Sequence, residues 1–212
     1  MTDVAAIVES LNSTTTMTGS SDTVESRLAE LYSAAPVGFK PVLLTGYHTG
    51  MRLEEVLTLT WDRVDLERGR IFLPGHLTKT GQERLVPITL TLKRELQRLR
   101  TLEGVTRIQG LVFHKDGKKL NHTYREVRRL CKEQKIEDFV FHDLRHCAVT
   151  NLADSGVDTE TIMKIVGHSS VETFLRYRTV KADRLDAAMT SLNTLITRHE
   201  NAARQVPELV TL

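Results

Sequence analysis

The sequence predicts an α+β protein that is mainly α-helical and carries a small antiparallel β-sheet. Most of the chain places apolar residues at the three- and four-residue spacing of amphipathic helices. Two short runs, 69–74 and 84–88, instead have strand character, and the turn residues Thr80-Gly81-Gln82 lie between them. The chain has 212 residues, 40% of them hydrophobic and 26% charged, so it is long enough to bury a core.

Helix stop signals divide the remainder of the chain. Gly50, Gly156 and Gly167 each follow an apolar helical segment, and glycine is common just past a helix C-terminus. Asp158 or Thr159 is a suitable N-cap for the segment that ends at Gly167. A third short strand is expected at 110–113. Helices are expected at 23–35, 39–48, 53–61, 90–102, 124–134, 144–155, 159–166, 171–178 and 183–201.

Composition along the chain predicts three parts. Residues 10–23 contain nine Ser or Thr and too few apolar side chains to fold alone, so 1–22 is expected to be a linker or tail. Residues 23–181 are expected to form the main domain. Residues 182–212 are expected to form a C-terminal helix and tail.

Several classes of protein are excluded by composition. No apolar run approaches the roughly 18 residues that a membrane-spanning helix needs, and the acidic start Met1-Thr2-Asp3 does not resemble a signal peptide. Cys131 and Cys147 are the only cysteines and lack CxxC spacing, which argues against a disulfide framework or zinc site. We therefore expect a soluble, cytoplasmic protein. Its net charge of +2 does not by itself indicate a nucleic-acid partner.

Two local patterns in the first half of the chain have both ordinary and functional interpretations. Arg52 follows a glycine turn at a helix start, and Glu55 lies three residues later on the same face. This pair is either a surface ion pair or a carboxylate that orients a functional guanidinium. Lys79, at the tip of the predicted hairpin, is either a solubility device or a functional amine.

Two further patterns follow in the second half. His142 and Arg145 are three residues apart, so one helical turn presents both to the same point; alone, His142 is also a plausible helix cap. His168 follows a helix-stopping glycine, and Tyr177 follows nine residues later. Separately, these two suggest a C-cap donor and a packing residue.

Taken in order, the four patterns resemble the catalytic domain of the tyrosine recombinases, the phage integrase family. The resemblance covers about residues 23–198 and includes the framing motifs Thr-Gly-Met-Arg, Thr-Lys-Thr-Gly, His-Asp-Leu-Arg-His and Gly-His-Ser-Ser. The residues that match the family's catalytic set are Arg52, Lys79, His142, Arg145, His168 and Tyr177.

This resemblance implies a DNA-cutting and DNA-joining enzyme that needs no cofactor and no metal. Tyr177 would be the nucleophile and form a 3′-phosphotyrosyl link, and Lys79 would be the general acid. Arg52 and Arg145 would stabilise the negative charge that develops on the phosphate, because guanidinium groups bind phosphate oxygens bidentately. Glu55 would orient Arg52 from behind.

The resemblance also implies double-stranded DNA as the partner and a homotetramer on that DNA, in a bacterial cell or phage-infected host and associated with the nucleoid. Segment 182–212 would dock on a neighbouring subunit, or its apolar stripe would pack on its own domain. A basic helix is a candidate DNA contact, although such charges are often only a solvated face. Its candidate residues are Arg125, Arg128, Arg129 and Lys132.

Two rival functions remain open on the sequence alone. A type IB topoisomerase-like enzyme would share the tyrosine and arginine chemistry but would relax DNA without pairing sites. An accessory DNA-binding module would keep the fold without turnover. Family members usually carry an additional N-terminal DNA-clamping domain, so the chain is expected to be a catalytic fragment or a minimal member.

Overall fold

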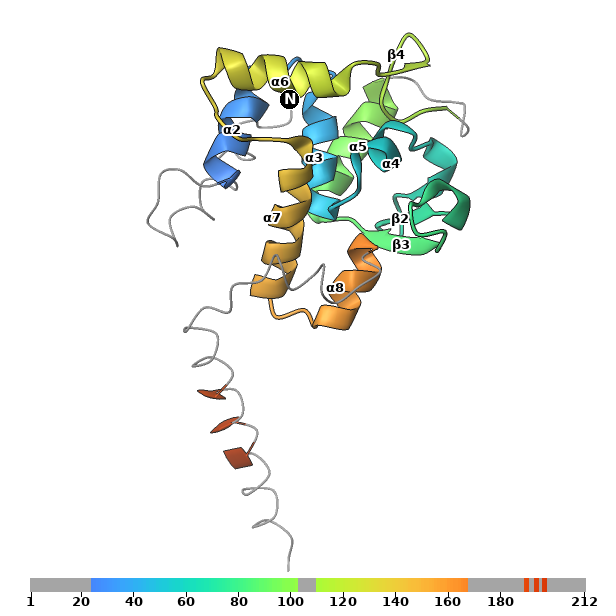
Figure 1. Cartoon of the computed structure of the whole chain (residues 1–212). Helices are drawn as coiled ribbons and strands as arrows, with labels where there is room; N and C mark the ends of the chain where they lie inside the picture. Colours follow the sequence, from blue (N-terminus) through green and yellow to red (C-terminus); the bar gives the residue numbers. More distant parts are fainter. Residues whose placement is uncertain (1–23, 103–109, 168–188, 191–192, 195, 198–212) are drawn as a thin grey trace, which may run out of the picture. The chain divides into compact units, whose positions relative to one another are not determined.

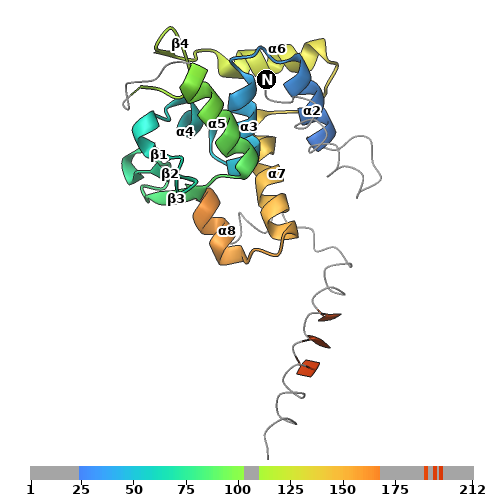
Figure 2. The same cartoon turned by 180° about the vertical axis from the view of Figure 1, so that it is seen from behind.

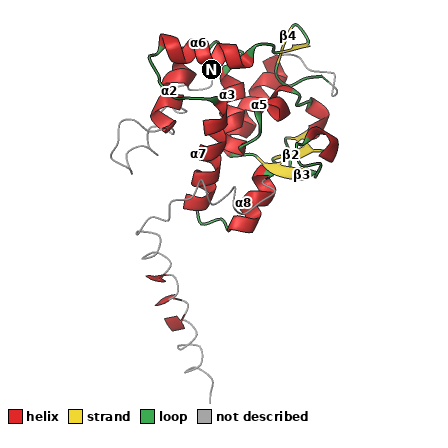
Figure 3. Cartoon of the chain, viewed as in Figure 1, coloured by secondary structure: helices red, strands yellow, loops and turns green. Residues whose placement is uncertain are grey.

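A computed structural model describes residues 24–102 and 110–167, together with 189–190, 193–194 and 196–197. Its helices are α2 (Val24–Ala34), α3 (Lys40–Thr49), α4 (Leu53–Leu57), α5 (Leu90–Leu102), α6 (Thr123–Glu133), α7 (Phe141–Asp154) and α8 (Thr159–Val166). Its strands are β1 (Val64–Asp65), β2 (Arg70–Leu73), β3 (Arg84–Pro87), β4 (His114–Lys115) and β5 (Lys118–Lys119). Figure 3 shows how far helix predominates over strand.

The main sheet is antiparallel with the strand order β1-β2-β3, and β4 and β5 pair separately as a hairpin. Ile71 pairs with Val86 and Leu73 with Arg84. Side chains alternate along β2, so Ile71 and Leu73 are buried whereas Phe72 is exposed. The register therefore brings Arg84 to the buried face of the sheet. Strand β1 was not predicted, because two residues are too few to show alternation.

Two predicted elements are wrong in detail. The helix expected at 53–61 ends at Leu57, because the chain then becomes extended and Leu59 O accepts a hydrogen bond from Val112 N at 2.8 Å. The strand expected at 110–113 forms only an isolated bridge between Leu111 and Thr60. These two segments pair with each other outside the main sheet.

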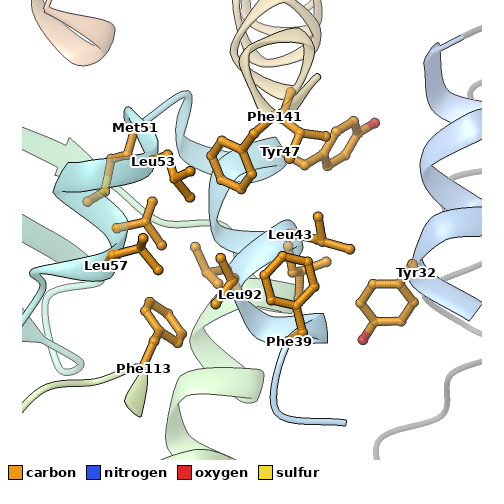
Figure 4. Close-up of a cluster of buried hydrophobic side chains, with 14 of the residues drawn as sticks. Tyr32, Phe39, Leu43, Tyr47, Met51, Leu53, Leu57, Leu92, Phe113 and Phe141 are labelled. Atoms are coloured by element: carbon orange, nitrogen blue, oxygen red, sulfur yellow. The ribbon is translucent and has the colours of Figure 1, made fainter. Parts of the chain in front are cut away.

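Helix α3 lies at the centre of the hydrophobic core. It is buried around nearly its whole circumference, and Figure 4 shows its Leu43 and Tyr47 among side chains of other helices. Tyr32 comes from α2, Leu92 from α5 and Phe141 from α7, and all belong to the same buried cluster. The core thus fixes the start of α7 against α3.

Helix α8 packs on both α7 and the sheet. Val149 and Ala153 of α7 form an apolar cluster with Ile162 and Val166 of α8. Helix α8 also contacts β3, and both views in Figures 1 and 2 show the two side by side. Asp158, one of the two residues expected as its N-cap, takes that position and accepts a hydrogen bond from Thr161 N at 2.9 Å. The C-terminal end of α8 consequently lies next to β3.

The chain divides into the units Met1–Tyr177 and Arg178–Leu212. In the second unit the described residues 189–190, 193–194 and 196–197 are helical. They lie within the helix predicted at 183–201, and the helix predicted at 171–178 is outside the described residues. Among the residues that the structure describes, no helix has the length and apolar character needed to cross a membrane.

Gly46 permits the close approach of α3 to α7. A Cβ atom at this position would lie 2.6 Å from Phe141 Cζ and 3.0 Å from Leu144 Cδ1. Both of these side chains are buried, so a larger residue would have to push the two helices apart.

We predict that Gly46→Val lowers the free energy of unfolding by about 1–3 kcal/mol, because overpacking a filled core forces strained rotamers or helix displacement. Urea denaturation measures the loss. Gly38→Val is the matched control, since no atom lies within 4 Å of a Cβ there. Equal losses for the two variants would contradict the packing argument.

Candidate active site

Glu55 is a buried carboxylate in the first turn of α4. Its side chain is 3% exposed. One oxygen accepts a hydrogen bond from Arg52 N at 2.8 Å, and the other accepts one from Arg52 Nη1 at 3.3 Å. A carboxylate at this position satisfies an N–H group that a helix start leaves unpaired. Glu55 therefore holds both the backbone and the guanidinium of Arg52.

Arg84 is the second arginine on this carboxylate, and sequence analysis assigned it no role. Its Nη1 and Nη2 donate to the two oxygens of Glu55 at 3.2 and 2.6 Å. Burial would raise the pKa of the Glu55 carboxyl, but the hydrogen bonds and charges of Arg84 and Arg52 outweigh it and hold the pKa below its ordinary 4.5. Glu55 is thus a carboxylate at neutral pH.

The last three carbonyls at the end of α8 each accept a hydrogen bond from a different arginine. Ile165 O accepts from Arg84 Nε at 3.1 Å. Val166 O accepts from Arg145 Nη1 at 2.6 Å. Gly167 O accepts from Arg52 Nη2 at 3.3 Å. Helix C-termini carry partial negative charge, so positive groups are favoured there.

Gly167 ends α8 in a left-handed conformation, with φ of +73°. A Cβ atom here would lie 2.8 Å from Arg84 Nη1. Glycine is therefore required both by the backbone and by the approach of Arg84.

Four of the predicted catalytic residues line one pocket of about 550 Å³. Arg52 comes from the start of α4, Lys79 from the loop between β2 and β3, and His142 and Arg145 from α7. Glu55 also lines this pocket. Arg145 is 3% exposed, and its Nη1 additionally donates to Gly50 O at 2.7 Å. The guanidinium of Arg145, a residue of α7, is therefore hydrogen-bonded both to the turn between α3 and α4 and to the end of α8.

Lys79 is exposed, and the loop that carries it is stabilised by hydrogen bonds between residues of the loop itself. The hydroxyl of Thr78 donates to Gly75 O at 3.0 Å and to Gln82 O at 2.9 Å. Gly81 N donates to Thr78 O at 3.2 Å, and Gly81 has φ of +70°. The loop therefore closes beneath Lys79 and presents its amine at the pocket.

His142 lies in the first turn of α7, because this helix begins three residues earlier than predicted. The Asp143 side chain accepts a hydrogen bond from Val140 N at 2.8 Å and stabilises that earlier start. The His142 ring is 5.1 Å from the ring of His146, centroid to centroid. Burial, His146 and Arg145 lower the pKa of His142 below 6.5. The imidazole is consequently neutral at pH 7.

Two members of the predicted set, His168 and Tyr177, lie outside the described residues. Their places in the site remain predictions. Within the part of the chain that is described, no group of three or more His, Cys, Asp or Glu side chains is arranged to hold a metal ion.

The candidate DNA-contact residues lie on the exposed side of α6, whereas Val127, Leu130 and Cys131 are buried. Arg129 differs from its neighbours because its guanidinium donates to Glu126 and Glu133, each at 2.6 Å. Its positive charge is therefore largely offset within the helix. Arg125, Arg128 and Lys132 are exposed.

The architecture is that of recombinase and integrase structures. The structure is similar to the crystal structure of XerA recombinase (TM-score 0.64, 23% identity, covering 80% of this chain and 64% of that one). It is also similar to the Tn1549 transposon integrase in complex with transposon right end DNA (TM-score 0.59, 20% identity, covering 82% and 65%). The mainly helical fold with a small antiparallel sheet, predicted from the sequence, is confirmed.

The sequence profile of the phage integrase family matches residues 14–184, so the chain belongs to this family. It is 30% identical over 152 residues to tyrosine recombinase XerC of Pelobacter propionicus, covering 69% of this chain and 49% of that protein. It is 33% identical over 129 residues to a Haemophilus influenzae protein described as an integrase or recombinase, covering 61% and 40%. The chain therefore spans less than half the length of these two relatives.

We predict that Glu55→Gln lowers the free energy of unfolding at pH 7 by about 3–5 kcal/mol, because it leaves buried arginine charge without its partner. The folded-state pKa of Glu55 is lowered, so its contribution is fully present above pH 4.5 and is lost as pH falls through the folded value. The difference in free energy of unfolding between the parent and Glu55→Gln should therefore become smaller below pH 4.5.

Urea titrations between pH 7 and pH 3 test this pH dependence. Glu54→Gln is the matched control, because Glu54 is 65% exposed and a surface change of this kind costs within about 0.5 kcal/mol. If the difference in free energy of unfolding between the parent and Glu55→Gln does not change with pH, Glu55 is not the ionised partner of the two arginines.

Proposed function

We propose that this chain is the catalytic domain of a site-specific DNA recombinase that breaks and rejoins DNA through Tyr177. The observation that carries the proposal is the convergence of Arg52, Lys79, His142 and Arg145 on one pocket. Membership of the phage integrase family supports it. So do the names of similar proteins, among them the shufflon-specific DNA recombinase of Escherichia coli, 30% identical over 163 residues.

The pocket is suited to stabilising a five-coordinate phosphate. Attack on a phosphodiester increases negative charge on the two non-bridging oxygens. Arg52 and Arg145 both carry guanidinium groups, which suit bidentate phosphate binding. Glu55 holds Arg52, and backbone carbonyls hold Arg145. Fixed charges of this kind need little reorganisation when the transition state forms, which is the main source of electrostatic catalysis.

The proposed chemistry is two successive transesterifications. In the first, the Tyr177 oxygen bonds to phosphorus, the bond to the 5′-oxygen breaks, and Lys79 protonates that leaving oxygen. The phenol proton passes to His142 or His168, and the lowered pKa of His142 leaves its imidazole neutral and able to accept. In the second, a 5′-hydroxyl of a partner strand bonds to phosphorus and gives its proton to Lys79. The bond from phosphorus to the Tyr177 oxygen breaks, and the histidine returns the proton to that oxygen.

Double-stranded DNA is the proposed substrate, with a homotetramer as the assembly that exchanges strands between two sites. Similar solved structures include XerH site-specific recombinase bound to palindromic difH substrate and a lambda integrase dimer bound to a core site. The exposed cations of α6 support a DNA contact beside the pocket, because Tyr124 of this helix lines the pocket itself. Residues 182–212 are proposed to dock on a neighbouring subunit.

Covalent capture tests the proposed nucleophile without knowledge of the DNA target. The parent chain and Tyr177→Phe are incubated with pooled nicked DNA fragments, denatured, and searched by mass spectrometry for a nucleotide-modified peptide. We expect an adduct on Tyr177 in the parent and none in the variant, with DNA binding unchanged. An adduct that persists in Tyr177→Phe would refute the assignment. Plasmid relaxation without strand exchange would favour a topoisomerase-like activity.

A second prediction concerns α6. Each phosphate contact contributes about −0.9 to the slope of log affinity against log salt concentration. We expect Arg128→Met to reduce the magnitude of this slope by about 0.9 on duplex DNA. Arg129→Met should change it less, because Glu126 and Glu133 already offset that charge. Fluorescence anisotropy at several salt concentrations measures both, and a larger effect from Arg129 would contradict the pairing.

A further inference from the structure

We propose that Arg84 is a positioning residue, which holds Arg52 and Arg145 in place through Glu55 and the end of α8 and keeps their positive charge available to the phosphate. The inference rests on the proposed function of the pocket. Arg84 belongs neither to the catalytic set nor to the candidate DNA contacts, and three separate observations support a role.

The first observation is the division of Glu55 between two arginines. Glu55 accepts two hydrogen bonds from Arg52 and two from Arg84, and the shortest of the four, at 2.6 Å, comes from Arg84 Nη2. A lone buried carboxylate would orient Arg52 but would also neutralise it. With Arg84 as the second partner, one negative charge faces two positive charges, so the cluster keeps a net positive charge beside the pocket.

The second observation is the link to Arg145. Arg84 Nε donates to Ile165 O, and the next carbonyl along the chain, Val166 O, accepts from Arg145. Neighbouring carbonyls of one helix end move together, so a shift of Ile165 would displace the group that holds Arg145. Arg84 is thus bonded to the carboxylate that holds Arg52 and to the carbonyl next to one that holds Arg145.

The third observation is that Arg84 is not placed to bind the phosphate itself. It is 8% exposed and is not among the residues that line the 550 Å³ pocket. Its Nε, Nη1 and Nη2 all donate to protein acceptors. What remains exposed borders a separate hollow that Phe72 and Met163 also line. Any effect of Arg84 on the reaction should therefore pass through Glu55 and α8.

Arg84 also connects this network to Lys79. It is the first residue of β3, which follows the Lys79 loop, and it is paired in the sheet with Leu73 just before that loop. The same strand therefore anchors the loop of the proposed general acid and the carboxylate that orients Arg52.

The experiment is a double-mutant cycle on single-turnover formation of the phosphotyrosine, with the DNA captured by the parent chain as substrate. We expect Arg84→Met to slow this step by about 100-fold, because small displacements of catalytic groups have effects of this size. The double variant Arg84→Met with Glu55→Gln should form the phosphotyrosine no more slowly than Arg84→Met alone, because both changes act on one network. Arg84→Lys keeps the charge but not the planar fork, and its rate should lie between those of the parent and Arg84→Met.

Arg98→Met is the matched control for destabilisation alone. Arg98 pairs with Glu95, a buried carboxylate of α5 that is 2% exposed, and neither residue lines the pocket. All rates are compared at a temperature at which circular dichroism shows every variant folded. If Arg84→Met alone does not fold, the double variant, which lacks a buried carboxylate left with Arg52 as its one arginine partner, replaces it in the comparison with Glu55→Gln.

Four results would overturn the inference while leaving the proposed function intact. Additive losses in the cycle would mean that Arg84 does not act through Glu55. A fall of about one in the salt slope of DNA binding for Arg84→Met would mean that it contacts a phosphate directly. An equal loss in Arg98→Met would mean that stability alone is responsible. If the parent chain forms no adduct, the proposed function fails and this inference fails with it, whereas undiminished adduct formation in Arg84→Met would overturn the inference only.

Discussion

The site depends on the end of α8, where three consecutive carbonyls are hydrogen-bonded to three arginines from separate parts of the chain. Arg52 is the N-cap of α4, Arg84 begins β3 and Arg145 lies in α7. No one of these elements could hold its arginine in this position alone. The apolar contacts of Ile162 and Val166 with α7 keep α8 in place, so ordinary core packing determines the geometry of the charges.

Burying this much charge is energetically unfavourable unless every charge is compensated. Glu55 is compensated by four hydrogen bonds from two arginines, and the partial negative charge of the helix end compensates the arginines in turn. Such a network contributes little net stability compared with an apolar cluster of the same volume. Its benefit is rigidity, which the proposed stabilisation of phosphate charge at this pocket would require.

The sequence predicted most of this fold and five of the residues at the pocket, among them Glu55, for a physical reason. Helices, caps and motifs such as His142-x-x-Arg145 depend on spacings of three or four residues, and such short spacings can be recognised in the sequence itself. The role of Arg84 is not visible there, because its partners Glu55 and Ile165 are 29 and 81 residues away. The early end of α4 likewise depends on Val112, a partner far along the chain.

The long sequence separations in the arginine network also bear on how the protein folds. Arg52 and Gly167 are 115 residues apart, and Arg145 and Gly50 are 95 apart. We expect contacts between residues so far apart in the sequence to form late, because the entropy of closing long loops must first be overcome. A chain still emerging from the ribosome could therefore contain folded helices and the complete hairpin while its arginines stay apart. The proposed DNA chemistry would then begin only when folding is complete, which would limit strand cleavage by unfinished molecules.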